Sequence, residues 1–280
     1  MRISTVIVNY KTPELLRECL RSLAQHAPQA RDIIVVDNAS KDETIALLAR
    51  EFPQVRRIAS RTNAGFAKAV NWGITNAREP YILILNPDVI VSAGSVQRLY
   101  QELETAPDIA LIAPKLQYPD GSLQYSCCRF QTPTYIVAHR SWLGSTSFGQ
   151  RLINHVRMVD YDHKTPRDVD WVIGGCMLVR RSAIEEVGLM DERYWLYIED
   201  MDWCRAFWQA GWRVRYDPRA VMTHHYRRQS AKAHGVRGLL TPLGRAHFIS
   251  GAKYFVKHIG NRRRLTEARK TGQDSALATH

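Results

Sequence analysis

The most constraining feature of the sequence is a regular alternation, from residue 3 to residue 104, between short apolar runs and segments with helical spacing of apolar residues. Runs rich in Ile and Val occupy residues 3–8, 32–37 and 81–85, and a shorter run occupies 56–60. Strands that alternate with helices form βαβ units around a parallel sheet, and strands buried on both faces read as continuous apolar runs. The sequence therefore predicts an α/β fold with a mostly parallel central sheet and helices on both faces.

Helices are expected between these runs. Thr12 and Pro13 open the first one, as N-cap and first helical residue, and further helices are predicted at 43–52, 64–77 and 95–104. Each helix would carry the chain from one strand back to the start of the next, in the right-handed sense that such crossovers take.

Polar residues end three of the predicted strands, at Asn9, Asp37 and the segment 86–88. Because the carboxyl ends of parallel strands lie at one edge of the sheet, these side chains are expected to gather there, where α/β proteins bind ligands. Asp37 would then lie near a nucleotide base or ribose, or else cap the segment that follows it.

Asp88 is a lone carboxylate inside the apolar run YILILNPDVIV, residues 81–91. Burying an unpaired carboxylate costs several kcal/mol in practice, so it needs a cation or a cluster of donors. Mg²⁺ and Mn²⁺ bind carboxylate oxygens, water and phosphate oxygens. The sequence therefore indicates a metal ligand at Asp88, with a turn in which Asp88 caps the next segment as the alternative.

A second carboxylate cluster lies in YIEDMDWC, where Glu199, Asp200 and Asp202 begin a predicted helix at 200–210. A helix N-terminus stabilises acidic side chains by roughly 0.3–1 kcal/mol, which is the simplest explanation. The cluster is also flanked by aromatic residues that suit the apolar faces of a sugar: Trp195, Tyr197, Trp203 and Trp208. A carboxylate in such a site can act as a general base toward an acceptor hydroxyl.

Two histidines, His224 and His225, directly follow a predicted strand, and imidazole can bind Mn²⁺. The nearby Arg227, Arg228 and Lys232 are candidates for phosphate oxygens.

The rest of the chain is less regular. Residues 118–167 contain several Pro and Gly and a weak helical signal, and we expect a loop-rich insertion there that bears on the substrate. Residues 170–179 read as a strand interrupted by Gly174 and Gly175. Further predicted elements are a short helix at 182–187 and short strands at 214–216 and 220–223.

The positive charge is concentrated in the last quarter of the chain. Residues 1–204 hold 23 Lys or Arg and 24 Asp or Glu, whereas residues 205–280 hold 16 and 3, so the net charge of +12 comes entirely from the end. Apolar residues recur at helical spacing over 243–259 beside these cations, which suits a helix in an anionic bilayer interface or one packed on the domain. We expect a catalytic domain at 1–240 and a basic amphipathic helix with a flexible tail at 241–280.

Composition excludes several classes of protein. The five cysteines include no C-x-x-C pair, so neither a disulfide framework nor a zinc site is expected, and a reducing cytoplasm is the predicted compartment. No run reaches the ~18–20 apolar residues of a membrane-spanning helix. The glycine-rich motifs of P-loop and dinucleotide-binding proteins are absent. Nucleic acid is not expected as a partner, because it would explain the charge but not the carboxylates.

Taken in order, these motifs resemble the family 2 glycosyltransferases of the GT-A fold, and most of all their bacterial rhamnosyltransferase-like branch. The resemblance covers about residues 4–230. It rests on VIVNY, VVDNASKD, NAGFAKAVNWG, LNPDV, GGCMLVRR and EDMDWCRA, which are weak singly and specific together.

The resemblance implies a nucleotide-sugar donor site. Its implied nucleotide-binding residues are Val8, Tyr10, Asp37, Asn63, Gly65 and Asn86. Asp88 matches the second Asp of the family's D-x-D metal motif, and Asn86 departs from the first. His224 would be a further ligand of Mg²⁺ or Mn²⁺, with His225 as the competing choice.

The resemblance also implies an acceptor side. Asp200 matches the general base, and the acceptor would be bound by Glu199, Trp171, Gly174 and Gly175. The expected reaction is inverting transfer of a sugar, possibly rhamnose from dTDP-rhamnose, to a saccharide or lipid-linked saccharide in cell-surface glycan synthesis. The enzyme would be cytoplasmic, possibly peripheral on the inner face of the membrane. The sequence carries no signal for the oligomeric state.

Two other functions remain open at this point. A sugar-phosphate nucleotidyltransferase would have a similar sheet, but such enzymes carry a glycine-rich basic loop after the first strand, where this chain has VNYKTPELL. A non-catalytic carbohydrate-binding protein is disfavoured by Asp88, Asp200 and His224, although Asn86 keeps it open.

Overall fold

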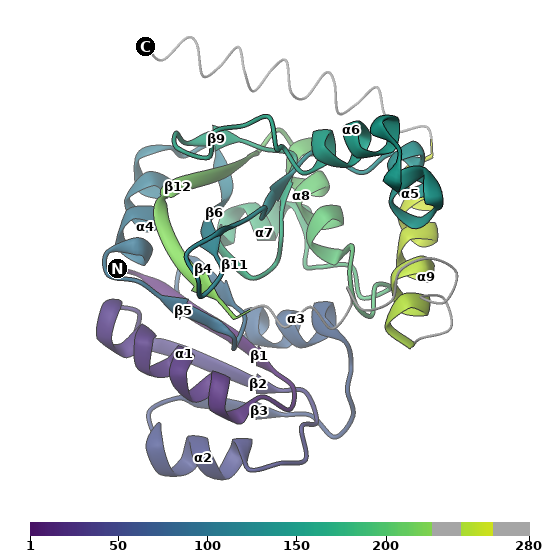
Figure 1. The fold of residues 1–280 in the computed structure, drawn as a ribbon. Helices are drawn as coiled ribbons and strands as arrows, with labels where there is room; N and C mark the ends of the chain where they lie inside the picture. Colours follow the sequence, from purple (N-terminus) through teal and green to yellow (C-terminus); the bar gives the residue numbers. More distant parts are fainter. Residues whose placement is uncertain (226–241, 260–280) are drawn as a thin grey trace.

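The computed structural model describes residues 1–225 and 242–259, and a twisted sheet runs through its centre (Figure 1). The main path of this sheet is, in spatial order, β3 (Arg56–Ala59), β2 (Asp32–Asp37), β1 (Ile3–Asn9), β4 (Tyr81–Leu85), β11 (Cys176–Arg180), β6 (Ile109–Gln117), β12 (Arg213–His224) and β5 (Val89–Val91). The first four strands are parallel, and so are β6 and β12. β11 joins the two parts, antiparallel to both of its neighbours. The predicted α/β fold with a mostly parallel central sheet is confirmed.

Helices cover both faces of the sheet (Figure 1). One face packs against α1 (Pro13–His26), α2 (Thr44–Glu51) and α4 (Ser95–Thr105), and the other against α3 (Phe66–Asn76), α7 (Arg181–Val187) and α8 (Glu199–Gln209). Alternate residues of β1 enter the two cores, Val6 and Val8 on the α3 side and Ile3 and Ile7 on the α1 side. This two-sided burial explains the continuous apolar runs of the sequence.

Thr12 starts α1 without capping it through its side chain, contrary to expectation. Its hydroxyl donates instead to Asn9 Oδ1, at 2.7 Å. Asn9 is fully buried at the end of β1, so this contact satisfies a polar group that would otherwise lack a partner.

The strand β6 was not predicted, although it lies near the centre of the sheet. Its sequence, IALIAPKLQ, contains Pro114, and proline is normally confined to edge strands and bulges because it has no N–H to donate. In the register of β12, Asp217 pairs with Pro114 and Val221 pairs with Lys115, so β12 bulges beside the proline. The same bulge explains why β12 reads in the sequence as two short strands.

The prediction of a loop-rich insertion at 118–167 is wrong in part, because the segment contains α5 (Pro133–Arg140), a short 3₁₀ helix (Trp142–Ser145) and α6 (Ser147–Val156). Thr132 and Thr146 cap α5 and α6 by accepting from backbone amides three residues on. These helices enclose a small apolar core of their own. The remaining strands around them are β7 (Leu123–Gln124), β8 (Cys127–Cys128), β9 (Arg167–Asp168) and β10 (Trp171–Val172).

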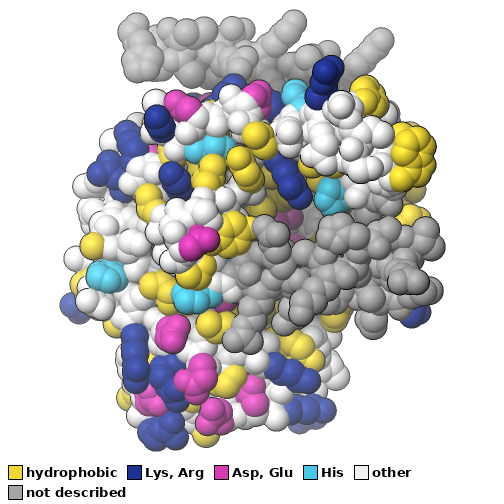
Figure 2. Space-filling model, viewed as in Figure 1, with side chains coloured by type: hydrophobic (Ala, Val, Ile, Leu, Met, Phe, Trp, Pro, Cys, Tyr) yellow, Lys and Arg dark blue, Asp and Glu magenta, His cyan; other side chains and the backbone are white. Residues whose placement is uncertain are grey.

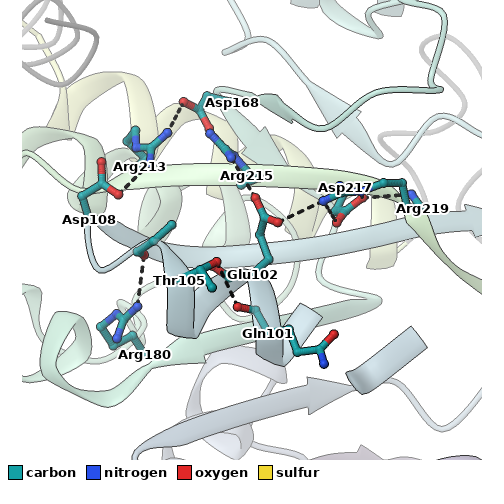
Figure 3. A network of polar contacts seen from close by, with 11 residues as sticks. Gln101, Glu102, Thr105, Asp108, Asp168, Arg180, Arg213, Arg215, Asp217 and Arg219 are labelled. Atoms are coloured by element: carbon teal, nitrogen blue, oxygen red, sulfur yellow. Dashed lines mark hydrogen bonds and ion pairs between the residues drawn. The ribbon is translucent and has the colours of Figure 1, made fainter. Parts of the chain in front are cut away.

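A network of ion pairs braces β12 against α4 and β9 (Figure 3). Arg213 contacts Asp108 at 2.6 Å and Asp168 at 3.0 Å, and Arg215 contacts Asp168 at 2.8 Å and Glu102 at 2.9 Å. Each guanidinium therefore joins carboxylates from two different elements. This network holds the start of the strand whose other end carries His224.

The helix α9 (Pro242–Lys257) packs one face on the domain. Its Tyr254 is 1% exposed and accepts from Arg205, while Lys257 and His258 contact Asp202 at 2.6 and 2.7 Å. α9 and the residues just after it also leave four apolar side chains exposed: Phe248, Ile249, Val256 and Ile259. Residues 226–241 and 260–280, with the predicted basic groups at Arg227, Arg228, Lys232 and 262–264, lie outside the described residues. Within the described segments, no helix is long and apolar enough to span a bilayer.

The closest approach of α3 to β1 generates a prediction on stability. Gly73 lies within α3, and a Cβ added there would overlap the Cγ1 atom of Val6. In Gly73→Ala, the better helix propensity of alanine adds up to about 1 kcal/mol to the free energy of unfolding. Overpacking of the core lowers it by about 1–3 kcal/mol, so we expect net destabilisation. Urea unfolding of Gly73→Ala, Val6→Ala and the double variant measures the effect, and the double variant should be more stable than additivity predicts.

Gly251 in α9 is the matched control, because a Cβ there would meet no atom within 4 Å. Gly251→Ala should leave stability unchanged or raise it by up to about 1 kcal/mol. Equal effects at Gly73 and Gly251 would contradict the proposed overlap with Val6.

Candidate active site

The site is organised by Gly174 and Gly175, which separate β10 from β11. The Gly174 amide donates to Asp200 Oδ2 at 3.0 Å, and the Gly175 carbonyl accepts from the Asn86 amide at 2.9 Å. A Cβ on Gly175 would lie only 3.3 Å from His224 Cε1, so the backbone passes close to that ring. Two adjacent residues therefore connect the start of α8 with the turn after β4 and the end of β12.

Asp88 and His224 are brought together from distant parts of the chain. Asn86 and Val89 close a tight turn through a backbone hydrogen bond of 3.2 Å, and this turn presents Asp88. The Asp88 Oδ1 atom lies 3.1 Å from His224 Nε2. The backbone amide of His225 donates to the carbonyl of Asp88, at 2.8 Å. Of the two candidate histidines, His224 thus faces Asp88 with its ring and His225 contacts it with its backbone.

Gln124 sets the protonation pattern of His224. Its Oε1 atom lies 2.9 Å from His224 Nδ1 and can only accept, so Nδ1 carries a ring proton and the neutral ring has its lone pair on Nε2. This lone pair faces the Asp88 oxygen, and two electron-rich atoms at 3.1 Å repel each other unless a proton or a cation lies between them. In a metal-bound histidine, the ring nitrogen that does not bind the metal usually donates a hydrogen bond to a neighbouring group, as Nδ1 does here.

Asp88 and His224 fit a divalent cation that takes most of its ligands from water and substrate phosphates. In the segments that the structure describes, no group of three or more His, Cys, Asp or Glu could hold a metal ion. Asp88 and His224 would provide two ligands, and Mg²⁺ or Mn²⁺ commonly completes its shell with water and substrate phosphates.

The backbone before α8 is strained where it positions the carboxylates. Tyr197 and Ile198 have φ values of 68° and 76°, in a region that side chains with a Cβ rarely adopt, β-branched residues least of all. Each such residue costs on the order of 1–3 kcal/mol and persists where the surroundings impose it, often at functional sites. The turn places Glu199 and Asp200 on the first turn of α8.

Glu199 and Asp200 have unequal environments. Burial raises the pKa of Asp200 to about 6, opposed by the backbone amides of Gly174 and Met201, which donate to its two oxygens at 3.0 and 2.8 Å. Burial, and then the charge of Asp200, raise the pKa of Glu199 to about 8, and its Oε2 atom is buried without a hydrogen-bond partner. Near pH 7 Asp200 is therefore ionised and Glu199 protonated. Different surroundings push the pKa values of two neighbouring carboxyl groups apart in this way.

Asp202, the third member of the predicted carboxylate cluster, lies elsewhere. It is 3% exposed and contacts Tyr194, Lys257 and His258. It therefore attaches α9 to α8, on a different face of the helix from Asp200.

The predicted nucleotide-binding residues lie at the carboxyl ends of β1 and β2 and in the loop before α3. Asp37 is buried and accepts from the backbone amide and hydroxyl of Ser40, so it also orders the turn after β2. Asn63 accepts from the Gly65 amide at 3.0 Å. Gly65 has a φ of 85°, and a Cβ there would overlap the carbonyl of Trp195, so this position requires glycine.

Three further predicted residues differ in how much surface they offer. Val8 is 8% exposed and pairs with Val36 within the sheet. Tyr10 is 43% exposed just beyond β1, where a ligand can reach its ring. Trp171 is 9% exposed and donates through Nε1 to the carbonyl of Arg129, so its ring mainly supports the β8–β10 pair.

Sequence reasoning missed two residues that order the site, Asn38 and Gln124. Asn38 bonds to Asn63 Oδ1, the Gly65 carbonyl and the Ala64 amide. Its position directly after Asp37 was a signal that could have been used. Trp195 was expected to flank the carboxylates, and the structure places its carbonyl and its indole Nε1 against the loop before α3. Gln124 has no local signal, because only the tertiary fold brings it to His224.

Comparisons with known proteins identify the family of this chain. The sequence profile of Glycosyl transferase family 2 matches residues 4–188. An N-acetylglucosaminyl-diphospho-decaprenol L-rhamnosyltransferase from Mycobacterium tuberculosis is 30% identical over 234 residues, which cover 80% of this chain and 76% of the relative. A low-salt glycan biosynthesis hexosyltransferase from Haloferax volcanii is 23% identical over 206 residues, covering 72% of this chain and 60% of the relative.

Solved structures share the fold. The mannosyltransferase PcManGT from Pyrobaculum calidifontis, in complex with GDP-Man and Mn²⁺, has a TM-score of 0.57 at 17% identity, covering 100% of this chain and 76% of that one. GalNAc-T7 with UDP, GalNAc and Mn²⁺ has a TM-score of 0.62 at 17% identity. That match covers 81% of this chain and only 43% of GalNAc-T7, so this chain spans less than half of it.

These likenesses confirm the predicted GT-A fold. The family profile covers well over half of the chain, and the mycobacterial relative is similar across most of both chains. The protein therefore belongs to glycosyl transferase family 2 and is rhamnosyltransferase-like.

Proposed function

We propose that this glycosyltransferase moves a sugar from a nucleotide-diphosphate donor to a saccharide or lipid-linked saccharide acceptor, with inversion at the anomeric carbon. The observation that carries the proposal is the meeting of the Asp88–His224 pair and Asp200 at Gly174 and Gly175. The first pair suits a cation that binds the donor diphosphate, and Asp200 suits a base.

The donor and acceptor classes are supported by the relatives. The mycobacterial relative is named for transfer of L-rhamnose to N-acetylglucosaminyl-diphospho-decaprenol, a lipid-linked saccharide. By analogy we propose dTDP-rhamnose as the donor of this enzyme and cell-surface glycan synthesis as its role. PcManGT was solved with GDP-Man and Mn²⁺, which supports a nucleotide sugar and a divalent ion here as well.

In the proposed reaction Asp200 removes the proton from an acceptor hydroxyl as the oxygen attacks the anomeric carbon. The bond from that carbon to the nucleoside diphosphate breaks, and the diphosphate leaves with the electron pair. The amides of Gly174 and Met201 hold the Asp200 carboxylate in place. The protonated Glu199 leaves Asp200 as the charged member of the pair and offers a donor to the acceptor. A bound Mg²⁺ or Mn²⁺ at Asp88 and His224 would neutralise the leaving diphosphate.

Asp200→Asn should lower kcat by about 10²–10⁴-fold with little change in donor binding, because the amide cannot accept the proton. In the wild type, kcat should fall about tenfold per pH unit below about 6, as the Asp200 carboxylate becomes protonated. Steady-state kinetics from pH 5 to 8, with calorimetric titration of the donor, measure both effects.

Asp202→Asn is the matched control for Asp200→Asn, since it makes the same chemical change two residues further along α8, on a face that contacts α9. Asp202→Asn should lower thermal stability, and it should reduce kcat far less than Asp200→Asn does. A larger loss of kcat in Asp202→Asn than in Asp200→Asn would show that the base is misassigned.

Asp88→Asn should reduce transfer by about 10²-fold or more, because it removes a ligand of the ion that stabilises the leaving group. The measurement is transfer across a Mg²⁺ and Mn²⁺ titration, with Asp120→Asn, an exposed turn carboxylate, as control. Full activity of the wild type in EDTA would refute the metal assignment.

We also propose that the enzyme binds anionic membranes peripherally. Figure 1 shows α5, α6 and α9 along one edge of the molecule, and the guanidinium of Arg205 lies between the rings of Phe130, before α5, and Tyr254 of α9. Figure 2 shows hydrophobic side chains at the surface near α5 and α6. Exposed apolar side chains on α5, α6, α9 and the 3₁₀ helix between α5 and α6 are Val137, Trp142, Phe148, Phe248, Ile249 and Val256. Trp142 is 76% exposed, and a tryptophan of this kind is typical of a membrane interface.

Trp142→Ser combined with Phe248→Ser should weaken co-sedimentation with liposomes of anionic lipid at least about fivefold, since each ring contributes buried apolar area. Ile45→Ser, an exposed apolar residue on α2, serves as control and should bind like the wild type. Absence of wild-type binding at low salt would refute the membrane proposal.

A further inference from the structure

A cavity of about 470 Å³ lies between α9 and the segment that precedes α8. Arg245, Ile249 and Lys253 line it from one face of α9, where they are spaced four residues apart. Arg193 and Trp195 line it from the opposite side. Trp195 also contacts the loop before α3, on the donor side of the site described above.

Charge and shape make this cavity a candidate for an anionic, partly apolar ligand. Three of its lining residues are cations, and Trp195 and Ile249 add apolar surface that is 43% and 51% exposed. The guanidinium of Arg193 has five N–H groups, and it uses the one at Nε to contact Asp191 at 2.9 Å. Lys253 uses one of its three donors on the Arg193 carbonyl, at 2.8 Å.

Two acidic side chains near this region, those of Asp191 and Asp202, share the cation Lys257. Asp191 contacts Lys257 at 2.8 Å as well as Arg193, and Asp202 contacts Lys257 and His258. Of the described residues that line the cavity, three are cations and none is acidic. Phosphate oxygens are the usual ligands of such a group of Arg and Lys side chains.

The cavity wall is continuous with the donor side of the candidate active site. The Trp195 carbonyl accepts from the Phe66 amide at 2.9 Å, and its indole Nε1 donates to the Asn63 carbonyl at 3.4 Å. Trp195 thus separates the cavity from the loop before α3. Five residues further along the chain is Asp200, the proposed base.

Ser250 fixes the geometry of this wall. Its hydroxyl donates to the Leu196 carbonyl at 3.0 Å, and its side chain is 2% exposed. Together with the Lys253 contact to Arg193, this bond attaches α9 to the segment that leads into α8.

We propose that this cavity binds the diphosphate of a lipid-linked acceptor, through Arg193, Arg245 and Lys253, and that Trp195 and Ile249 contact the first carbons of the lipid. The proposal rests on the proposed function and specifies its acceptor class. The exposed apolar side chains of α9, among them Phe248 and Val256, would continue the path of the lipid toward a bilayer. The saccharide would extend from the diphosphate past Trp195 toward Asp200.

The test is calorimetric titration with farnesyl diphosphate, a soluble short-chain prenyl diphosphate, and it needs no catalytic activity. Arg245→Gln with Lys253→Gln should weaken binding at least about tenfold, because charge-assisted hydrogen bonds are lost. Arg98→Gln with Lys164→Gln removes the same charge from exposed positions elsewhere and should bind like the wild type. Arg245→Gln alone should lower the affinity for farnesyl diphosphate about threefold. Circular dichroism verifies that each variant is folded.

Two reference ligands separate the parts of the site. Farnesol lacks the phosphates and should bind weakly and equally to all variants. Inorganic pyrophosphate should bind more weakly than farnesyl diphosphate, and equal affinity would refute the contact of Trp195 and Ile249 with the lipid. Unchanged farnesyl diphosphate binding in the double variant, or no binding to the wild type, would refute the site.

These outcomes are independent of the proposed function. In one outcome, the double variant loses farnesyl diphosphate binding but the wild-type enzyme transfers no sugar from any nucleotide sugar. The cavity would then stand as a prenyl diphosphate site, and the proposed reaction would be rejected. Sugar transfer to a lipid-linked acceptor with equal KM in wild type and double variant would retain the reaction and reject the cavity.

Discussion

The hydrogen bond from the Gly174 amide to Asp200 is the contact on which the rest of the site depends. It joins the break between β10 and β11 to the first turn of α8, and the next residue, Gly175, receives the Asn86 amide and passes beside His224. A Cβ at Gly175 would lie 3.1 Å from Leu116 Cδ1 and 3.3 Å from His224 Cε1, so a side chain there would press on both neighbours. The strained Tyr197 and Ile198 hold the other side of the same contact. Through one short segment, elements that are more than 80 residues apart in sequence are placed around a common space.

Burial then gives the site its chemistry. Two adjacent carboxyls cannot both ionise at low cost in a desolvated position, and the amides that donate to Asp200 decide which of them carries the charge. Asp88 and His224 meet under a similar constraint, because two electron-rich atoms face each other at 3.1 Å and need a positive charge between them. Both arrangements are costly in isolation, and both suit a reaction that needs a base on one side and neutralisation of a diphosphate on the other.

Much of this could be predicted from the sequence, and the failures have physical causes. The strands β1, β2 and β4 are buried on both faces, so their apolar runs identified the α/β fold directly. β6 was missed because Pro114 argues against a central strand, and only its pairing with β12 shows the bulge that accommodates it. Asp88, Asp200 and His224 stand out in the sequence because of their chemical type and their place at element ends. Gln124 acts through a tertiary contact alone, and Asp202 differs from Asp200 only through its contacts with Lys257 and His258.

The central claim is that the fold keeps Glu199 protonated and Asp200 ionised at neutral pH. The most direct measurement is a ¹³C NMR titration of the carboxyl groups in protein labelled at Asp and Glu, with Glu199→Gln and Asp200→Asn to assign the two resonances. This protonation pattern requires that Asp200 titrates near pH 6 and Glu199 near pH 8, and that the pKa of Glu199 falls when the charge of Asp200 is removed. Titration of both groups close to pH 4, as in solvent-exposed carboxyls, would contradict it.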